Sequence, residues 1–320
     1  MLHRDAGQAI CEIGLGVDHR LVVVAELADQ RRMGDGRRSL AVDCNLVKTK
    51  SGACAPLFVC VASDPGSADL DHIGGRRCGG FGVFHELLRN GIELRCLGAM
   101  LPKLTPRLYS ISSSPLAHAG QIHTTVAVVR YNAHNRERGG VCSTLFADRA
   151  SVSDRLPLYI QPNKRFKLPS DSDAPMIMIG PGTGIAPFRG FLHERLALGA
   201  KGKNWLFFGE RSATTDYLYR DELEAMQADG HLTRLDTAFS RDQENKVYVQ
   251  DRMLEQAPRF WSWLQDGASV YICGDASRMA KDVHGALQSI VEKQGQLSST
   301  AAEEYVQALK EQHRYHRDVY

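Results

Sequence analysis

The feature that most constrains the fold is an alternation of short apolar runs with helical patterns, which begins at Met176 and continues along the chain. The runs are MIMIG, NWLFFG, LTRLDTAF and SVYICG, and a segment of helical periodicity follows each of them. Buried strands that alternate with helices are typical of a parallel sheet covered on both faces. The sequence therefore predicts an α/β domain with helices on both faces of its sheet.

The chain before Met176 has a different pattern. HTTVAVVRY and LPLYIQ are rich in β-formers and surround one short helical piece, CSTLFADR, which favours an antiparallel barrel or sheet. The polar stretch QPNKRFKLPSDSDAP contains three prolines and is interpreted as an interdomain linker, with a boundary near Asp171. Nearer the start, LVVVAEL and LFVCVA are candidate strands, but no period is sustained. We expect residues 81–170 and 171–320 to form two domains, with 1–80 a possible disordered or remnant segment.

Composition restricts the classes of protein to consider. The chain has 320 residues, 43% of them hydrophobic and 24% charged, and no apolar run approaches the ~20 residues that span a bilayer. Its first residues do not have the pattern of a signal peptide, so we expect a cytoplasmic protein without a membrane association. The formal net charge of +2 and the absence of a basic block argue against nucleic acid as a partner. Eight cysteines are present without any C-x-x-C pair, which argues against a metal site.

A glycine-rich turn follows the first of the apolar runs. Gly180, Gly182 and Gly184 precede Pro187 and a helical segment. Glycines at this point allow the backbone to approach a pyrophosphate, which the amides and dipole of the helix N-terminus stabilise. Gly182 and Thr183 are therefore candidate cofactor contacts. The alternative is a tight turn between strand and helix without a ligand.

A second polar cluster follows the third run. Ser240, Arg241, Lys246 and Tyr248 are expected at the carboxyl edge of the sheet, where α/β proteins bind their ligands. A guanidinium that forks onto phosphate oxygens suits the 2′-phosphate that distinguishes NADPH from NADH. The alternative is a solvated run of charges between a strand and a helix.

The fourth run ends at Cys273, again at the carboxyl edge, and Asp282 lies in the helical segment that follows. A cysteine there can lie beside a nicotinamide. It can equally be a small buried residue, which is common for free cysteines. The sequence leaves both readings open.

In the β-rich part, Arg107, Tyr109 and Ser110 lie within four residues. If the segment is extended, Arg107 and Tyr109 share one face and Ser110 lies on the other. An arginine for a pyrophosphate, a ring for stacking and a hydroxyl at the reactive edge suit a flavin site. Ser143, in the first turn of the helical piece after Gly140, is a candidate for a second pyrophosphate contact. An ordinary strand and an ordinary helix start are the alternatives.

Taken together, these segments resemble a known family. RLYSISSSP, GGVCSTLFADR, MIMIGPGTGIAPFRGF, NWLFFGER, TAFSRDQENKVYVQD, YICGDASRMAKD and RYHRDVY occur in the same order in the ferredoxin-NADP reductase-like diflavin reductases. SRDQ-x-x-KVYVQD and the ending RDVY are the most specific, and they favour the branch of the family that serves NADPH-dependent sulfite reductase. The resemblance begins near Leu101 and runs to Tyr320.

The resemblance implies a role for each matching residue. The implied FAD contacts are Arg107, Leu108, Tyr109, Ser110, Thr125, Val126, Ala127, Tyr131, Gly140, Val141, Cys142 and Ser143, with Tyr320 covering the flavin until nicotinamide displaces it. The implied NADPH contacts are Ser240, Arg241, Lys246, Val247, Tyr248, Val249, Gln250 and Asp282. Hydride transfer is implied to be assisted by Ser110, Cys273 and Asp318, which position the two rings and balance charge.

The implied activity is hydride transfer from NADPH to FAD, with electrons passing on in the context of sulfite reduction, sulfur assimilation and cysteine biosynthesis. The implied partners are an FMN-carrying flavodoxin-like protein, since FMN is expected only on a separate domain or chain, and a haem and iron-sulfur subunit. The alternatives are a general NADPH-hemoprotein or diaphorase-type reductase, and a degenerate NADP-binding module without flavin or catalysis.

The chain departs from the family before about Phe81, where the first barrel strands and the connecting helical insert are not recognisable. We therefore expect the FAD-binding barrel to be incomplete. A stretch rich in cysteine and arginine next to a well-matched domain is typical of a gene fragment or a disrupted reading frame.

Overall fold

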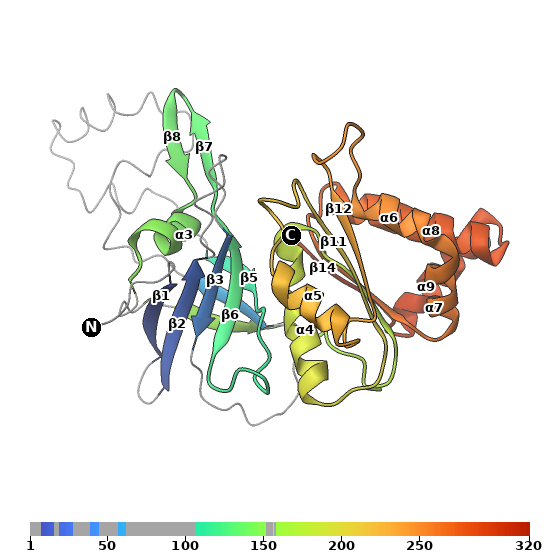
Figure 1. Ribbon diagram of the computed structural model, residues 1–320, viewed down its shortest axis with the longest axis horizontal. Helices are drawn as coiled ribbons and strands as arrows, with labels where there is room; N and C mark the ends of the chain where they lie inside the picture. The colour runs from blue at the N-terminus through green and yellow to red at the C-terminus, as the bar shows by residue number, and fades with distance from the viewer. Residues whose placement is uncertain are drawn as a thin grey trace, which may run out of the picture.

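The protein is described here from a computed structural model, which covers residues 106–151, 156 and 158–320 in full and the backbone of four earlier strands. Those strands are β1 (Gln8–Leu15), β2 (His19–Leu27), β3 (Ser39–Cys44) and β4 (Leu57–Val61). Figure 1 shows a β-rich half that joins an α/β half. The segment between β9 and β10, which ends before Met176, connects the two halves.

The α/β half is a parallel sheet with the strand order β12-β11-β10-β13-β14. Its strands are β10 (Met176–Ile179), β11 (Asn204–Glu210), β12 (Arg234–Phe239), β13 (Ser269–Gly274) and β14 (Tyr315–Val319). Because β10 and β11 are buried along almost their whole length, they are continuous apolar runs in the sequence. The four strands expected from the sequence are confirmed.

Helices cover both faces of this sheet, also as expected. On one face, α4 (Ala186–Ala197) and α5 (Arg220–Ala228) pack against Met178, Leu206 and Phe208. On the other face lie α6 (Val249–Glu255), α7 (Ala257–Gln265), α8 (Met279–Gly295) and α9 (Ser299–Glu311). Two apolar cores result, one on each side of the sheet.

The fifth strand, β14, is an element that the apolar pattern did not predict. It pairs in parallel with β13, so that Cys273 lies opposite Asp318. Only Tyr315 and Asp318 of its five residues are buried, and His316 and Arg317 interrupt any apolar run. The strand forms because β13 offers it a hydrogen-bonding edge, which is information that its own sequence does not carry.

The polar segment before Met176 is more than a linker, which corrects the interpretation from the sequence. Gln161 and Pro162 belong to β9 (Leu158–Pro162). Phe166 is 1% exposed and stacks on Phe191 of α4, with ring centroids 5.7 Å apart. One aromatic side chain in a polar stretch thus anchors the connection in the core of the α/β half.

The β-rich half contains antiparallel sheets. β6 (Ile122–Ala127) completes the sheet β1-β2-β3-β6, and β5 (Arg107–Ser110) and β9 lie on either side of β4. The expected strands in LVVVAEL and LFVCVA are confirmed as β2 and β4. A separate hairpin joins β7 (Arg130–Ala133) to β8 (Arg136–Gly139), and CSTLFADR forms the short helices α3 (Val141–Thr144) and η3 (Leu145–Arg149).

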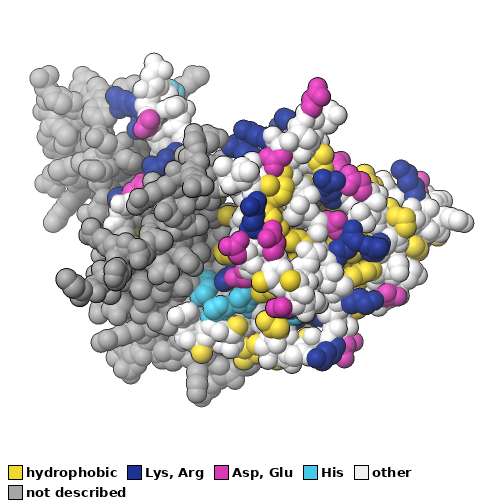
Figure 2. Space-filling model, viewed as in Figure 1, with side chains coloured by type: hydrophobic (Ala, Val, Ile, Leu, Met, Phe, Trp, Pro, Cys, Tyr) yellow, Lys and Arg dark blue, Asp and Glu magenta, His cyan; other side chains and the backbone are white. Residues whose placement is uncertain are grey.

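A closed ring of five polar side chains joins the two halves, and we call it the seam ring. Arg189 donates to Glu222 at 2.8 Å, and the Glu222 carboxylate lies 2.9 Å from His193 Nε2. His193 stacks on His118 at 4.7 Å between ring centroids, and His118 meets the edge of His123 at 4.3 Å. His123 Nδ1 lies 3.0 Å from Arg189, which closes the ring. Figure 2 shows histidine side chains gathered on this face of the molecule.

The electrostatics of the seam ring favour a neutral His118 and an ionised Glu222. Burial, followed by the nearby His123, His193 and Arg189, lowers the pKa of His118 to about 4. Burial alone would raise the pKa of Glu222, but hydrogen bonds from His193 and Arg189 outweigh it and hold that pKa at about 2. At neutral pH the ring therefore contains an ionised Glu222 and an uncharged His118.

We predict that His118 makes the stability of the protein depend on pH. Because its pKa is lowered on folding, the unfolded chain binds a proton between about pH 6.5 and pH 4 that the folded chain does not bind. The free energy of unfolding should therefore be fully retained above about pH 6.5 and fall as the pH drops towards 4. In His118→Gln this slope should be shallower, by about one proton, in urea denaturation series.

His134→Gln is the matched control, because His134 is exposed at the turn of the β7–β8 hairpin. An equal flattening of the slope in both variants, or in neither, would contradict the assignment to His118.

Candidate functional site

The glycine turn after β10 is held by close backbone contacts. It forms η4 (Gly182–Ile185), and α4 follows directly with Pro187 in its first turn. A Cβ atom on Gly184 would lie 2.2 Å from the Cys273 carbonyl oxygen, and one on Gly180 would lie 2.6 Å from the Gly184 carbonyl oxygen. Only glycine fits at these two positions, so the turn lies directly against the end of β13.

The remaining glycine of the turn has a conformational role. Gly182 has φ +59°, in the left-handed region, and a Cβ atom there would lie 3.3 Å from a carboxylate oxygen of Glu210. Thr183 is half-buried, and its hydroxyl lies 2.9 Å from the hydroxyl of Tyr320. The turn is therefore bounded by β11 on one side and by the end of β14 on the other.

The residues predicted to contact NADPH lie along the same carboxyl edge. Ser240 and Arg241 directly follow β12, and their amides donate to the carbonyls of Glu210 and Arg211. Arg241, Lys246 and Tyr248 are exposed, Ser240, Val247 and Gln250 are half-buried, and Asp282 is exposed in the first turn of α8. Because every strand of the sheet is parallel, one edge collects these side chains.

Val249 is the exception in this set. It is the first residue of α6, is 3% exposed and belongs to the apolar core. A Cβ on Gly209 would lie 2.8 Å from its side chain. Its side chain therefore lies in the core, and only its backbone is available at the carboxyl edge where the other candidates lie.

Ser110, Cys273 and Asp318 meet where the two halves join. Ser110 ends β5 of the β-rich half, whereas Cys273 and Asp318 lie opposite each other on β13 and β14. The Cys273 Sγ lies 3.9 Å from Asp318 Oδ2, and Ser110 is close enough to both side chains to lower the pKa of each. All three residues are buried. The structure thus brings together three residues that the sequence separates widely.

The environment of this cluster favours neutral groups. Burial, followed by the Asp318 carboxylate, raises the pKa of the Cys273 thiol well above its usual value. Burial also raises the pKa of Asp318 to about 6, although hydrogen bonds from Ser110 and Cys273 oppose the shift. Cys273 is therefore a thiol at neutral pH, and Asp318 changes charge close to neutrality.

Tyr320 is fixed by its backbone and leaves its ring exposed. Its amide donates to the Gly274 carbonyl, and its carbonyl accepts from the Ala276 amide. The residue is 62% exposed, two positions beyond Asp318. An exposed aromatic ring beside a buried polar cluster can cover a planar ligand.

The predicted flavin contacts occupy the β-rich half. On β5, Arg107 and Leu108 are exposed, and Tyr109 is half-buried with its ring 6.0 Å from that of Phe146. Around the turn into α3, the Ser143 hydroxyl accepts from the Val129 amide and donates to the Gly140 carbonyl. Cys142 and Ser143 are buried, whereas Gly140 and Val141 are half-buried.

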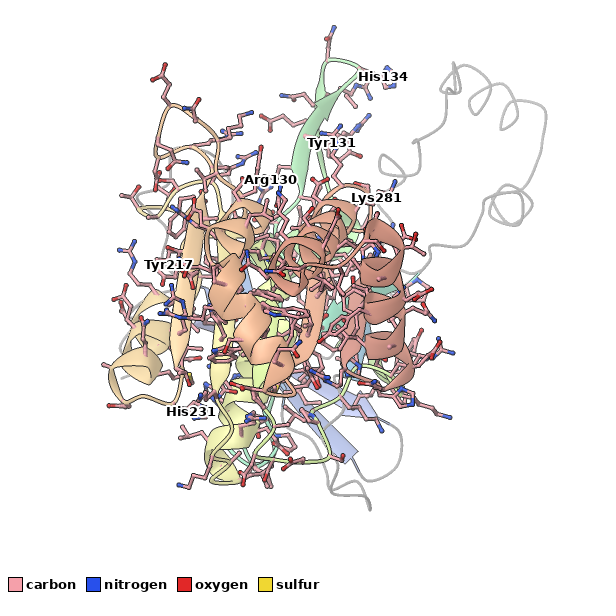
Figure 3. The ribbon with its side chains drawn as sticks, turned by 90° about the vertical axis from the view of Figure 1, so that its right-hand side faces the viewer. Arg130, Tyr131, His134, Tyr217, His231 and Lys281 are labelled. Carbon is pink, nitrogen blue, oxygen red and sulfur yellow. The ribbon has the colours of Figure 1, made fainter. Side chains whose placement is uncertain are left out.

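The four predicted flavin contacts on and after β6 differ in how far they are buried. Thr125 and Val126 are buried, Ala127 is exposed, and Tyr131 is 53% exposed on the hairpin. The hydroxyl of Thr125 lies 2.6 Å from that of Tyr219 in the α/β half, so it is already engaged across the seam. Figure 3 shows Tyr131 at the same end of the molecule as Lys281 of α8, with His231 at the opposite end.

Sequence reasoning missed several polar residues that contact Asp318 or connect the two halves. Asn163 donates to Asp318 at 3.4 Å, and Arg189 and Tyr219 reach across the seam to Ser112 and Thr125. The four-residue spacing of Arg189 and His193 on a helix marks one shared face. Nothing in that spacing indicates that the face meets another domain.

Two features are absent from the described residues. No helix there is long and apolar enough to cross a membrane. In the same part of the chain, no group of three histidine, cysteine, aspartate or glutamate side chains is placed to hold a metal ion.

Comparison with known families gives two matches along the chain. The FAD binding domain matches residues 83–145, and the oxidoreductase NAD-binding domain matches residues 178–285. The first match covers β5 to α3, and the second covers the glycine turn and the carboxyl edge up to α8.

Individual relatives agree with these matches. The chain is 53% identical over 222 residues to a sulfite reductase [NADPH] flavoprotein alpha-component of Bacillus subtilis, which covers 69% of this chain and 37% of the relative. Proteins of the same name from Vibrio cholerae and Klebsiella pneumoniae are 54% and 47% identical, over 69% and 72% of this chain and 36% and 38% of the relatives. The chain thus spans little more than a third of the length of these relatives. With both domain types matched in order, it belongs to the ferredoxin-NADP reductase-like family of diflavin reductases.

Proposed function

We propose that the chain is an NADPH-dependent flavoprotein reductase that transfers a hydride from NADPH to FAD and passes electrons onward. The observation that carries the proposal is the meeting of Ser110 with Cys273 and Asp318. These residues come from opposite halves, one matched as an FAD domain and the other as an NAD domain. A buried polar cluster at such a junction suits a reaction between two bound cofactors.

The carboxyl edge of the α/β half fits a phosphorylated dinucleotide. Gly182 and Thr183 are proposed to hold the pyrophosphate, because the turn is narrow and precedes the N-terminus of α4. Ser240, Arg241 and Lys246 are proposed to hold the 2′-phosphate, since Arg241 and Lys246 are exposed cations beside the half-buried hydroxyl of Ser240. Tyr248, Gln250 and Asp282 complete the proposed contacts, with Val247 and Val249 contributing backbone.

The β-rich half offers groups that fit a flavin nucleotide, in an FAD-binding barrel that we propose to be incomplete and to be centred on residues 81–170, with β1 to β4 contributing strands to its sheets. Arg107 supplies a cation, Tyr109 a ring, and the turn at Gly140 and Ser143 supplies backbone amides. The exposed ring of Tyr320 is proposed to cover the flavin. Bound FAD would accept a hydride and release its electrons one at a time.

The reactive cluster would control charge and water at the point of transfer. Its three side chains are buried, so water is excluded there. A neutral Cys273 leaves Asp318 as the group that changes charge, and Ser110 holds both in place. An ionised Asp318 would stabilise positive charge on an oxidised nicotinamide.

The names of the relatives suggest the acceptor. Because they are sulfite reductase [NADPH] flavoprotein alpha-components, we propose that electrons pass to an FMN-carrying flavodoxin-like protein and then to a haem and iron-sulfur subunit that reduces sulfite to sulfide. Under this proposal the chain serves sulfur assimilation and cysteine biosynthesis in the cytoplasm.

The proposal is tested by incubating the purified chain with FAD, removing free flavin by gel filtration and recording the visible spectrum. We expect retained flavin and NADPH-dependent reduction of ferricyanide that exceeds the reduction supported by NADH. A colourless protein that still binds NADPH would contradict the reductase and favour a module that binds nucleotide alone.

Arg241→Ala should weaken binding of NADPH by about 1–3 kcal/mol, since a charge-assisted contact to the 2′-phosphate is lost. Binding of NADH should change far less. The measurement is calorimetric titration with each cofactor, and Arg259→Ala, an exposed arginine on α7, is the control. Equal losses for the two cofactors would refute the role of Arg241.

Asp318→Asn should lower the rate of flavin reduction and remove its dependence on pH near neutrality. In the unsubstituted chain the rate should rise as the pH rises through about 6, because Asp318 ionises there. Rapid-mixing measurements of flavin bleaching by NADPH across this range provide the test, with the exposed Asp229→Asn as the control. A pH profile that survives in Asp318→Asn would assign the ionisation to another group.

A further inference from the structure

Helix α4 contacts both parts of the proposed reaction centre. At its N-terminus it continues directly from η4, the turn proposed to hold the pyrophosphate. Near its middle, Arg189 donates to the Ser112 carbonyl at 3.0 Å. A Cβ on Gly190 would lie 3.1 Å from the Ser113 carbonyl, so the helix lies against this backbone. One rigid element therefore spans from the dinucleotide turn to the segment after Ser110.

The segment after Ser110 is held from several sides. The Glu194 carboxylate accepts from the Ser114 hydroxyl. The Ser112 amide donates to the His123 carbonyl at 2.7 Å, and the His123 amide donates to the Ser113 hydroxyl at 2.9 Å. The segment can therefore hardly shift without breaking a contact to α4 or to β6.

Tyr219 adds a contact from the helix next to α4. It is the N-cap of α5 and has φ +56°, a left-handed conformation that side chains rarely adopt. Its hydroxyl lies 2.6 Å from that of Thr125, and its ring lies 4.8 Å from the Arg189 guanidinium. A strained backbone here is offset by contacts that cross between the halves.

The contacts of Arg189 are chemically specific. Its guanidinium meets Glu222, the Ser112 carbonyl and His123 Nδ1, which must accept because arginine only donates. A lysine would keep the charge but could not make this fan of hydrogen bonds. The Nδ1 atom of His123 therefore carries no proton as long as it accepts from Arg189.

We propose that Arg189 and Tyr219 are positioning residues that fix Ser110 relative to the dinucleotide turn and thereby set the geometry of hydride transfer. The proposal rests on the proposed function and adds two residues that are outside the sets proposed to contact the cofactors. Because a hydride moves over a short distance, a small displacement between the halves is enough to slow its transfer. Binding of NADPH, whose proposed contacts all lie in the α/β half, should change little.

The test uses the full chain with Tyr219→Phe and Arg189→Lys. Tyr219→Phe removes only the hydroxyl and keeps the ring beside Arg189. The controls are Tyr217→Phe and Arg220→Lys, which make the same changes nearby, where the Tyr217 ring stacks on Phe208 at 5.5 Å and the Arg220 guanidinium lies 4.9 Å from that ring.

Two measurements are made on each variant. Hydrogen exchange of the flavin-free chain should show the amides of Ser112 and His123 exchanging roughly 5-fold faster in Tyr219→Phe, and faster still in Arg189→Lys. In the flavin-loaded chain, the limiting rate of flavin reduction should fall roughly 10-fold or more, with the KM for NADPH within about twofold. The controls should leave both readouts unchanged.

The outcomes separate this proposal from the proposed function. If neither the unsubstituted chain nor any variant reduces flavin, the proposed function fails. The exchange data still show whether Arg189 and Tyr219 hold the segment after Ser110 in place. Faster exchange with an unchanged limiting rate would make the contacts merely structural. A raised KM with an unchanged limiting rate would make them binding contacts. Either result would overturn the positioning role.

Discussion

The arrangement of the whole site depends on how closely the glycine turn approaches the end of β13. With no Cβ on Gly184, the turn lies directly against the Cys273 carbonyl, and any larger residue would force them apart. The same approach brings Thr183 to Tyr320 at the end of the adjacent strand. A single missing methyl group therefore allows the turn, β13 and β14 to meet at one point.

Parallel strand pairing brings the remaining site residues of the α/β half to one edge of the sheet. β10 lies between β11 and β13, so the loops after all three strands emerge at one edge, and β14 adds Asp318 beside Cys273. The β-rich half contributes Ser110 from β5. The proposed reaction centre is therefore divided between the two halves, and its geometry depends on the contacts that join them.

Much of this arrangement could be predicted because it is local in the sequence. The strands MIMIG and SVYICG are apolar along their length, which predicts buried strands. The glycines of the turn indicate a close approach of the backbone. What could not be predicted depends on partners distant in the chain. β14 forms on an edge supplied by β13, and Phe166 fills a core built by later residues. In the sequence, Arg189 cannot be distinguished from an ordinary arginine on a helix surface, because its partner Ser112 lies far away along the chain. The meeting of Ser110 with Asp318 was implied by family resemblance and by no local pattern.

The left-handed backbone of Tyr219 sets local stability against communication between the domains. A non-glycine residue in this conformation costs on the order of 1 kcal/mol, and a glycine at the start of α5 would relieve the cost. Such a chain would have a more stable α5 and a looser junction, because the ring and hydroxyl that reach Arg189 and Thr125 would be gone. The stability of α5 alone would favour a glycine at position 219, so retention of the tyrosine in a lineage would report on selection for how the two halves are aligned.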